Sequence, residues 1–293
     1  WYNAPTASRR PGRFFWAKYG EHMDFIVAIK ALILGVVEGL TEFLPVSSTG
    51  HLIVVGSLLN WNDEKGEVFE IVIQFAAILA ICWVYRQRLW TVITTLPRER
   101  KSQLFTWNLV LAFLPAAILG VIFIGTVKKY LFAPVPVATA FIVGGILILL
   151  IEGRKRAARV ENIDAIKPPD ALWIGIAQTL SIIPGTSRSG ATIMGGLLRG
   201  LSRPAATEFS FFLAIPTIFG ATVFQLWKAR HLLNVDDLAV IGVGSIASFI
   251  SAMIAVRALL RYVSGHNFKV FAWYRIAFGF VILGTWYFGV VKW

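Results

Sequence analysis

Long apolar runs recur along most of this 293-residue chain and are separated by short polar or basic segments. Six of the runs are long enough, and free enough of charge, to predict helices that cross a lipid bilayer, which needs about 20 mostly apolar residues. Because such runs make up so much of the chain, lipid is expected to be its main solvent. The six predicted spans are residues 68–86, 108–125, 136–152, 207–227, 237–260 and 270–291.

Two further segments, residues 25–59 and 171–200, are apolar at both ends but polar in the middle. Each middle has a proline followed by hydroxyl side chains, which predicts a helix, a break and a second helix. Irregular backbone at membrane depth is tolerated only inside protein or beside a water-filled cavity, so we interpret both segments as re-entrant hairpins. Proline suits the first turn of a helix, so Pro45 is expected to begin the second helix of its hairpin.

The two halves of the chain resemble one another. Pro45 and Pro184 are separated by almost the same interval as Glu70 and Glu208, and each half contains one hairpin and three spans. Since three is odd, the second half must be inserted upside down relative to the first. The predicted fold class is an all-α integral membrane protein with an inverted-topology repeat, built from six transmembrane helices and two re-entrant helical hairpins.

This repeat also predicts how the chain is divided. Residues 23–152 form the first repeat, residues 171–293 form the inverted second repeat, and a cytoplasmic linker of residues 153–170 joins them within one structural domain. Residues 1–22 have scattered aromatic and basic side chains but no spanning run. We interpret them as a non-native or disordered N-terminal extension and exclude them from the fold.

Composition and charge agree with a membrane protein. The chain is 57% apolar with a mean hydropathy of +0.69, and only 15% of its residues are charged, whereas soluble proteins have nearer a quarter. The net charge of +12 does not predict a nucleic-acid partner, because the basic residues lie in short loops between spans. Fifteen lysines and arginines fall on one side of the membrane and six on the other, so the first side is expected to be cytoplasmic. The single cysteine, Cys82, provides neither a disulfide nor a thiolate metal site.

Two glutamates in the first interrupted segment are the strongest candidates for metal ligands. Glu38 and Glu42 are four residues apart and so share one helical face. Carboxylates facing lipid are costly, and ionisable residues within a membrane generally mark function. The pair therefore predicts a site for a divalent cation such as Mg²⁺, which prefers oxygen ligands. The alternative is a solvated or salt-bridged pair near a helix end.

The residues after Pro45 supply a hydroxyl and an imidazole. Ser48 and His51 are three apart and neighbours on one helical face, which places a hydroxyl nucleophile beside a general base. His51 could instead activate water directly, and a capping serine with a structural histidine is the alternative without chemistry. The start of a helix favours an anion, so Ser47 and Thr49 are expected to bind substrate.

The second polar segment predicts an anion-binding site. Arg188 can hold a phosphate through two parallel hydrogen bonds, although an ion pair with Glu38 or Glu42 is the structural alternative. Glycines allow the backbone to approach a ligand, and hydroxyls donate hydrogen bonds. The predicted substrate-binding residues here are Gly185, Ser187, Ser189, Gly190 and Thr192. Other polar residues at or within the spans are expected mostly to cap helices or pair with one another: Glu70, Gln74, Arg203, Glu208 and Arg275.

These segments resemble a known family. EGLTEFLPVSSTGH at residues 38–51, PGTSRSGAT at 184–192 and EFSFFLAIP at 208–216 are similar to the undecaprenyl-diphosphate phosphatase family, also called the bacitracin-resistance protein family. The likeness runs from about Met23 to the C-terminus, and residues 1–22 are the departure from it. It implies an enzyme of the bacterial inner membrane that removes the terminal phosphate of undecaprenyl diphosphate, which recycles the carrier lipid for cell-wall synthesis and confers bacitracin resistance. It assigns the catalytic positions to Glu38, Glu42, Ser48, His51 and Arg188.

The expected cofactor is a divalent cation, Mg²⁺ or Ca²⁺, held by Glu38 and Glu42. The expected partners are a polyprenyl diphosphate lipid and membrane lipids, and no nucleic acid is expected. A homodimer is left open. The active site is expected to open toward the periplasm. A flippase of prenyl phosphate lipid is the alternative function, because inverted repeats are common in transporters. The two-histidine class of lipid phosphatases, with its SR-x5-H-x3-D motif, is excluded because no such histidine follows Arg188 or Arg203.

Overall fold

The computed structural model describes residues 25–61, 64–154, 157–230 and 237–291, and the predicted extension of residues 1–22 lies outside this part. All regular elements in the described part are helical, and six of the helices are long and apolar enough to cross a membrane. The six predicted spans are therefore confirmed, with ends that differ by a few residues except at α5. These helices are α3 (Glu64–Val84), α5 (Arg100–Tyr130), α6 (Pro134–Glu152), α9 (Arg203–Ala229), α10 (Leu238–Val263) and α11 (Lys269–Tyr287).

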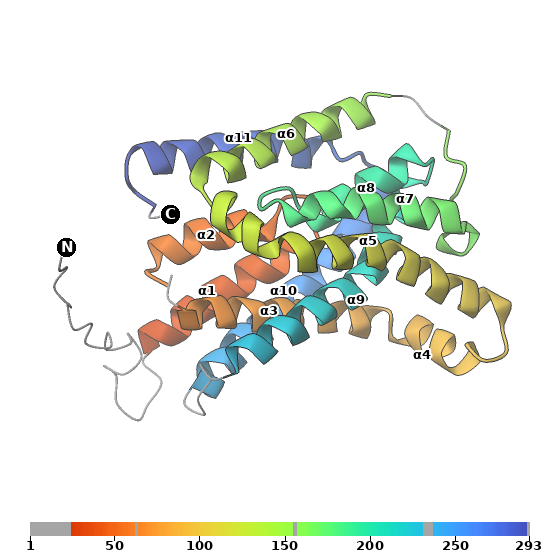
Figure 1. Cartoon of the computed structure of the whole chain (residues 1–293), viewed down its shortest axis with the longest axis horizontal. Coiled ribbons are helices and arrows are strands. Elements are labelled where there is room, and N and C mark those ends of the chain that lie inside the picture. The colour runs from red at the N-terminus through yellow and green to blue at the C-terminus, as the bar shows by residue number, and fades with distance from the viewer. Residues whose placement is uncertain (1–24, 62–63, 155–156, 231–236, 292–293) are drawn as a thin grey trace, which may run out of the picture.

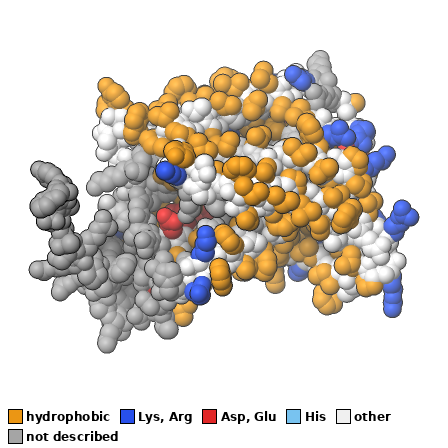
Figure 2. Space-filling view, in the orientation of Figure 1, with side chains coloured by type: hydrophobic (Ala, Val, Ile, Leu, Met, Phe, Trp, Pro, Cys, Tyr) orange, Lys and Arg blue, Asp and Glu red, His pale blue; other side chains and the backbone are white. Residues whose placement is uncertain are grey.

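The long helices run side by side along the longest axis of the molecule (Figure 1). Apolar side chains cover the flank that they present, whereas lysines and arginines gather toward its two ends (Figure 2). Large apolar side chains such as Ile246 and Trp273 are more than 60% exposed on these helices. A surface of this kind needs lipid around it, and the chain is a multi-pass membrane protein.

The two interrupted segments form pairs of shorter helices. The first pair is α1 (Phe25–Thr41) and α2 (Ser48–Leu58); the second is α7 (Pro168–Gln178) and α8 (Arg188–Leu198), with a short 3₁₀ helix, η3 (Thr179–Ile182), after α7. The prediction that Pro45 begins a helix is wrong: α2 begins at Ser48, and Pro45 lies in the turn before it. The turns of the two pairs meet near the middle of the bundle (Figure 1).

Each short pair packs against a long helix from the other half of the chain. α1 lies along α10, and α7 lies along α5. Glycines permit both approaches: a Cβ atom added to Gly39 would stand 2.7 Å from the backbone nitrogen of Ala252, and one added to Gly175 would stand 2.7 Å from the Cα atom of Ala112. Separations this small exclude any larger residue, so the backbones of the two halves touch directly.

One helix was not expected from the sequence. α4 (Arg86–Thr95) occupies part of the basic segment 86–107, and its Trp90 and Ile93 are more than 60% exposed. An amphipathic helix with basic and aromatic side chains suits the membrane interface. α4 is short and has few apolar positions, so a search for apolar runs long enough to cross the membrane does not find it.

Ion pairs connect the linker of residues 153–170 to neighbouring helices. Asp164 in the 3₁₀ helix η2 (Ile163–Ala165) pairs with Arg88 and, at 2.9 Å, with Lys101. Partial burial opposes ionisation of Asp164, but the hydrogen bonds from these two cations outweigh it and lower the pKa of the carboxyl. Asp170 pairs at 3.0 Å with Arg199 at the end of α8. The described part of the linker is thus joined to the starts of α4 and α5 and to the end of α8.

Candidate functional site

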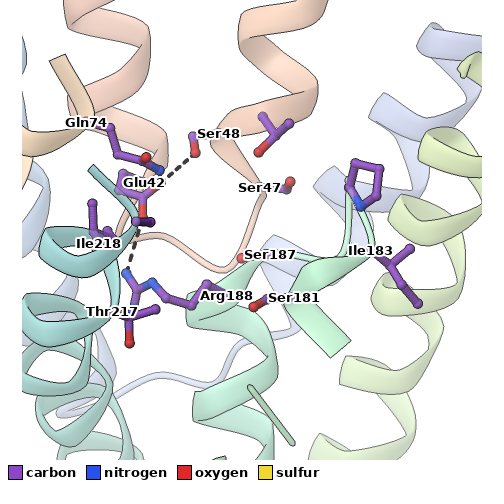
Figure 3. Close-up of a pocket in the computed structure, with 14 residues that line it drawn as sticks. Glu42, Ser47, Ser48, Gln74, Ser181, Ile183, Ser187, Arg188, Thr217 and Ile218 are labelled. Atoms are coloured by element: carbon purple, nitrogen blue, oxygen red, sulfur yellow. Dashed lines mark hydrogen bonds and ion pairs between the residues drawn. The ribbon is translucent and has the colours of Figure 1, made fainter. Parts of the chain in front are cut away.

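The turns of the two short pairs touch and enclose a cavity (Figure 3). The hydroxyl of Ser189 donates to the carbonyl oxygen of Leu44 at 2.7 Å, which joins one turn to the other. The cavity beside this contact has a volume of about 180 Å³, and α3 and α9 close its far side. A cavity of about 10–15 Å³ is large enough for one water molecule, so this cavity has room for a phosphate group. The lining residues are Glu42, Ser47, Ser48, Thr49, Gln74, Ser181, Ile183, Pro184, Gly185, Ser187, Arg188, Thr217, Ile218 and Ala221.

Two helices begin at this cavity. α2 starts after Ser47 and α8 starts after Ser187, and both preceding serines adopt left-handed backbone conformations, with φ of 70° and 73°. Such conformations are costly for a residue with a side chain and cluster at functional sites. The positive dipole ends of two helices therefore lie at one space, which is a favourable arrangement for an anion.

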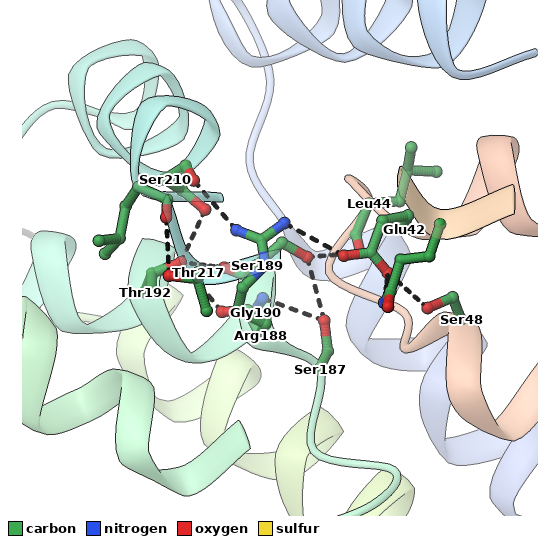
Figure 4. A network of polar contacts seen from close by, with 12 residues as sticks. Glu42, Leu44, Ser48, Ser187, Arg188, Ser189, Gly190, Thr192, Ser210 and Thr217 are labelled. Carbon is green, nitrogen blue, oxygen red and sulfur yellow. Dashed lines mark hydrogen bonds and ion pairs between the residues drawn. The ribbon is translucent and has the colours of Figure 1, made fainter. Parts of the chain in front are cut away.

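Glu42 is the centre of the polar contacts in the cavity (Figures 3 and 4). One carboxylate oxygen accepts a 2.6 Å hydrogen bond from the hydroxyl of Ser48 and a longer one, at 3.4 Å, from the amide of Gln74. The other oxygen lies 3.4 Å from a terminal nitrogen of Arg188. The carboxylate thus connects the first turn, α3 and α8 at the place where the hydroxyl of Ser48 is exposed to the cavity.

Glu38 lies one helical turn before Glu42 and is only 1% exposed. Both of its carboxylate oxygens are buried and have no hydrogen-bond partner among the described residues. The charges of Glu42, Glu70 and Arg188 act on it. A buried carboxylate without a partner is costly, so this orphaned group fits a site for a cation. The described residues contain no group of three or more His, Cys, Asp or Glu side chains placed to hold a metal ion.

The hydrogen-bond donors of Arg188 are not all used within the protein. Its side chain is buried beside the ring of Phe43, and one terminal nitrogen donates to the carbonyl oxygen of Ser210 at 3.0 Å. Its Nε atom has no partner among the described residues. The ion pair with Glu42 is long, at 3.4 Å. An arginine held in place but incompletely paired can still bind an anion in the cavity that it lines.

His51 lies outside the cavity and does not meet Ser48. Its Nδ1 atom lies 2.7 Å from the carbonyl oxygen of Ser47, which can only accept, so Nδ1 carries a proton. Its Nε2 atom lies 2.6 Å from the hydroxyl of Tyr274, and the ring stacks on Phe278 with centroids 4.1 Å apart. The structure therefore pairs Ser48 with Glu42 and not, as expected, with His51.

The other predicted binding residues divide into two groups. Ser47, Thr49, Gly185 and Ser187 line the cavity, whereas Ser189, Gly190 and Thr192 lie behind it. The rear group holds the framework together (Figure 4): the N–H group of Gly190 donates to the Ser187 hydroxyl at 3.1 Å, and the Thr192 hydroxyl bonds to that of Ser210 at 2.6 Å. These bonds fix the start of α8 against α9.

Several residues of the site were missed or undervalued from the sequence. Gln74 is a lone polar residue within an apolar span, and that signal singled it out, although only as a minor candidate. Ser181 lies just before Pro184 in the second interrupted segment, but it was not singled out, whereas Thr217 and Tyr274 come from the distant helices α9 and α11.

Comparison with known proteins agrees with the geometry. Residues 31–281 match the family described as bacitracin resistance protein BacA. Relatives named undecaprenyl-diphosphatase include those of Nitrosospira multiformis and Dechloromonas aromatica, each 60% identical, and of Cupriavidus metallidurans, 55% identical; each alignment covers 92% of this chain and 99% of the relative. This chain belongs to the BacA bacitracin-resistance protein family.

Proposed function

We infer that this protein is an undecaprenyl-diphosphatase, which hydrolyses undecaprenyl diphosphate to undecaprenyl phosphate and inorganic phosphate. The observation that carries this function is the grouping of Ser48, Glu42 and Arg188 in a cavity where two helices begin. A nucleophile, a proton acceptor and an anion grip together are what phosphoryl transfer requires. The names of relatives that are 55–60% identical over nearly their full length support the same activity. Membership of this family also accounts for bacitracin resistance.

The shape of the cavity suits an amphiphile. Its lining combines the polar groups of the two turns with three apolar side chains, those of Ile183, Ile218 and Ala221. In this proposal the diphosphate headgroup contacts the polar groups, and the first prenyl units contact the apolar side chains. The rest of the lipid tail then lies in the bilayer beside the spans.

The proposed reaction begins at Ser48. Its hydroxyl oxygen attacks the terminal phosphorus, the bond from that phosphorus to the bridging oxygen breaks, and undecaprenyl phosphate leaves. Glu42 takes the hydroxyl proton, because it already accepts a 2.6 Å hydrogen bond from Ser48. Water then cleaves the phosphoserine and releases inorganic phosphate. His51 fixes the carbonyl of Ser47 and thereby the start of α2.

Charge stabilisation supplies the rest of the catalysis. Arg188 binds the non-bridging oxygens of the terminal phosphate, with the helix starts at Ser47 and Ser187 around them. Glu38 and Glu42 would hold a divalent cation, Mg²⁺ or Ca²⁺, because the oxygens of Glu38 are buried without a partner. A cation there would supply further neutralisation of the diphosphate charge.

Phosphate release tests both the activity and the cation. Purified protein in detergent should release inorganic phosphate from undecaprenyl diphosphate, and excess chelator should abolish the release. Glu38→Gln should lower the rate severely, because one carboxylate alone holds a divalent cation poorly. Glu161→Gln, in the exposed part of the linker, serves as the control and should leave the rate within about twofold.

The two parts of this test can fail separately. Full turnover in excess chelator would remove the cation from the proposal but keep the enzyme. A wild-type protein that releases no phosphate from any prenyl diphosphate would overturn the enzymatic function.

The inverted repeat and the two re-entrant hairpins remain part of this proposal. The reciprocal packing of α1 on α10 and α7 on α5 supports them, as do the two matching left-handed serines. The same features favour a flippase as the second candidate. Phosphate release in micelles, where no membrane gradient exists, distinguishes an enzyme from a transporter alone. The sequence leaves a homodimer open, and the mass of the protein–detergent particle would decide whether one forms.

The orientation can be tested by labelling. The Lys/Arg asymmetry predicts that the loop between α5 and α6 is periplasmic and that the loop between α4 and α5 is cytoplasmic. In a Cys82→Ser background, a cysteine replacing Phe132 should react in intact cells with an impermeant thiol reagent, and one replacing Arg98 should react only after lysis. Labelling of position 98 in intact cells would invert the orientation and make the active site cytoplasmic.

A further inference from the structure

Arg275 of α11 is a buried cation that the proposed reaction does not use. Its side chain is 1% exposed and is the largest of the fully buried side chains in the described part of the chain. From the sequence we expected it to cap a helix or to pair with another polar residue of the spans. It does neither, because its hydrogen-bond partners among the described residues are all backbone carbonyls.

The guanidinium uses all of its donors on those carbonyls. Arginine has five N–H groups, and five carbonyl oxygens accept from them at 2.8 to 3.4 Å. The accepting oxygens come from three segments: the first turn, the second turn and α6. They belong to Pro45, Gly185, Thr186, Ala140 and Phe141.

Two of these segments are the turns that form the cavity. The Nη1 atom of Arg275 donates to Pro45 at 3.3 Å and to Thr186 at 2.8 Å, so one nitrogen joins the turn before α2 to the turn before α8. Its Nη2 atom donates to Gly185, a cavity-lining residue with φ of 90°, at 2.9 Å. The guanidinium therefore lies directly behind the two backbone turns that face the phosphate.

The surrounding backbone is shaped to admit this group. A Cβ atom added to Gly144 would collide with Nη2 of Arg275, and one added to Gly190 would stand only 3.4 Å from Nη1. A buried charge is costly unless hydrogen bonds satisfy it. Saturation of all five donors provides that compensation, so the charge does not need an acidic partner.

The residue before Arg275 also reaches the first turn. Tyr274 lies 2.6 Å from Nε2 of His51, which in turn bonds to the carbonyl of Ser47. Two consecutive residues of α11 are thus linked to the turn before Ser48: Arg275 bonds directly to Pro45, and Tyr274 is linked through His51 to Ser47.

From these contacts we infer that Arg275 is a positioning residue, which sets the backbone of both phosphate-binding turns from behind without contacting the substrate. It has no free donor for a phosphate, so its effect passes through Pro45, Gly185 and Thr186. This role rests on the proposed phosphatase activity, but the geometry that it controls can be measured separately. Transition-state stabilisation depends on donor placement more strictly than substrate binding does, so loss of Arg275 lowers kcat more than it raises KM.

Kinetics of three variants test the inference. Arg275→Met should lower kcat on undecaprenyl diphosphate by about 100-fold with a much smaller change in KM, as expected for a displacement of about 1 Å. Arg275→Lys should lose about tenfold, because an ammonium has three donors for five carbonyls. Arg203→Met, which removes an arginine paired with Glu152 at the far end of α9, is the matched control and should stay within threefold.

A distance measurement separates positioning from loss of function for other reasons. Nitroxide labels at exposed positions 58 and 198, at the ends of α2 and α8, report the arrangement of the two turns in a Cys82→Ser background. Pulsed paramagnetic resonance should give a narrow distance distribution in the parent and a broader or shifted one in Arg275→Met. If that variant does not fold, Arg275→Lys decides by the same two measurements.

An unchanged distance distribution, or a kcat within twofold of the parent in a folded variant, overturns the positioning role. An inactive parent protein overturns the proposed phosphatase activity instead, and the distance measurement still decides whether Arg275 sets the turns.

Discussion

Ser48→Ala should remove nearly all phosphatase activity while leaving substrate binding largely intact. Ser48 is the attacking group in the proposed reaction, and its hydroxyl already lies 2.6 Å from the carboxylate of Glu42. If Ser48 only donated a hydrogen bond to substrate, its loss would cost about 1–3 kcal/mol and leave a measurable rate. Steady-state rates and binding of a non-hydrolysable diphosphonate lipid distinguish the two cases. Ser264→Ala, at the exposed end of α10, is the control.

Rapid quenching identifies the nucleophile directly. With terminally radiolabelled substrate, the label should appear on Ser48, and Glu42→Gln should slow its appearance because the proton acceptor is lost. Label on His51, or no labelled protein despite fast turnover, would replace serine attack by histidine attack or by direct attack of water.

Arg188→Lys should lower kcat/KM by at least about 100-fold, which corresponds to about 2.7 kcal/mol of transition-state stabilisation. Lysine keeps the charge, but it cannot bond to the carbonyl of Ser210 and grip a phosphate with a planar pair of donors at once. The measurement is phosphate release over a range of substrate concentrations.

Arg199→Lys is a suitable comparison, since Arg199 pairs with Asp170 far from the cavity and its replacement should change the rate by less than about threefold. A rate near that of the parent for Arg188→Lys would reduce Arg188 to a structural partner of Glu42.

The spans and the two polar turns could be predicted because each depends on a local pattern. Apolar length predicts a membrane helix, and a proline beside hydroxyls predicts a break, without knowledge of what packs nearby. The ion pair of Arg188 with Glu42 was also among the expected alternatives, because few charged residues lie at that depth. α4 escaped prediction because an interfacial helix has no spanning run.

The pairing within the site could not be predicted in the same way. Spacing puts Ser48 and His51 on one helical face, but helical side chains lean toward the N-terminus, so His51 reaches the carbonyl of Ser47 one turn earlier. Ser48 is the first residue of α2, and its hydroxyl turns toward Glu42 in the preceding segment. Helical spacing determines which residues are neighbours. It does not determine with which of several possible partners a side chain at the end of a helix forms its hydrogen bond.

Arg275 illustrates the same limit over a longer distance. Its five carbonyl partners lie between 89 and 230 residues away in the chain. Backbone oxygens carry no sequence signature, so nothing in the amino-acid sequence marks them as acceptors. Sequence patterns indicate acidic partners for a buried arginine, whereas only the assembled fold shows that carbonyls replace them.

The packing of α1 against α10 has a consequence for biosynthesis. Ribosomes add about 5–20 residues per second, so α1 enters the membrane roughly 10 to 40 s before its partner helix is made. Throughout that interval Glu38 and Glu42 lack the part of their surroundings that α10 provides in the finished bundle. The nascent chain must therefore hold α1 at the interface or against the insertion machinery. A chain truncated after α6 lacks both α10 and Arg188, so we expect its carboxylates to be less well shielded and the chain to become a target for membrane proteases.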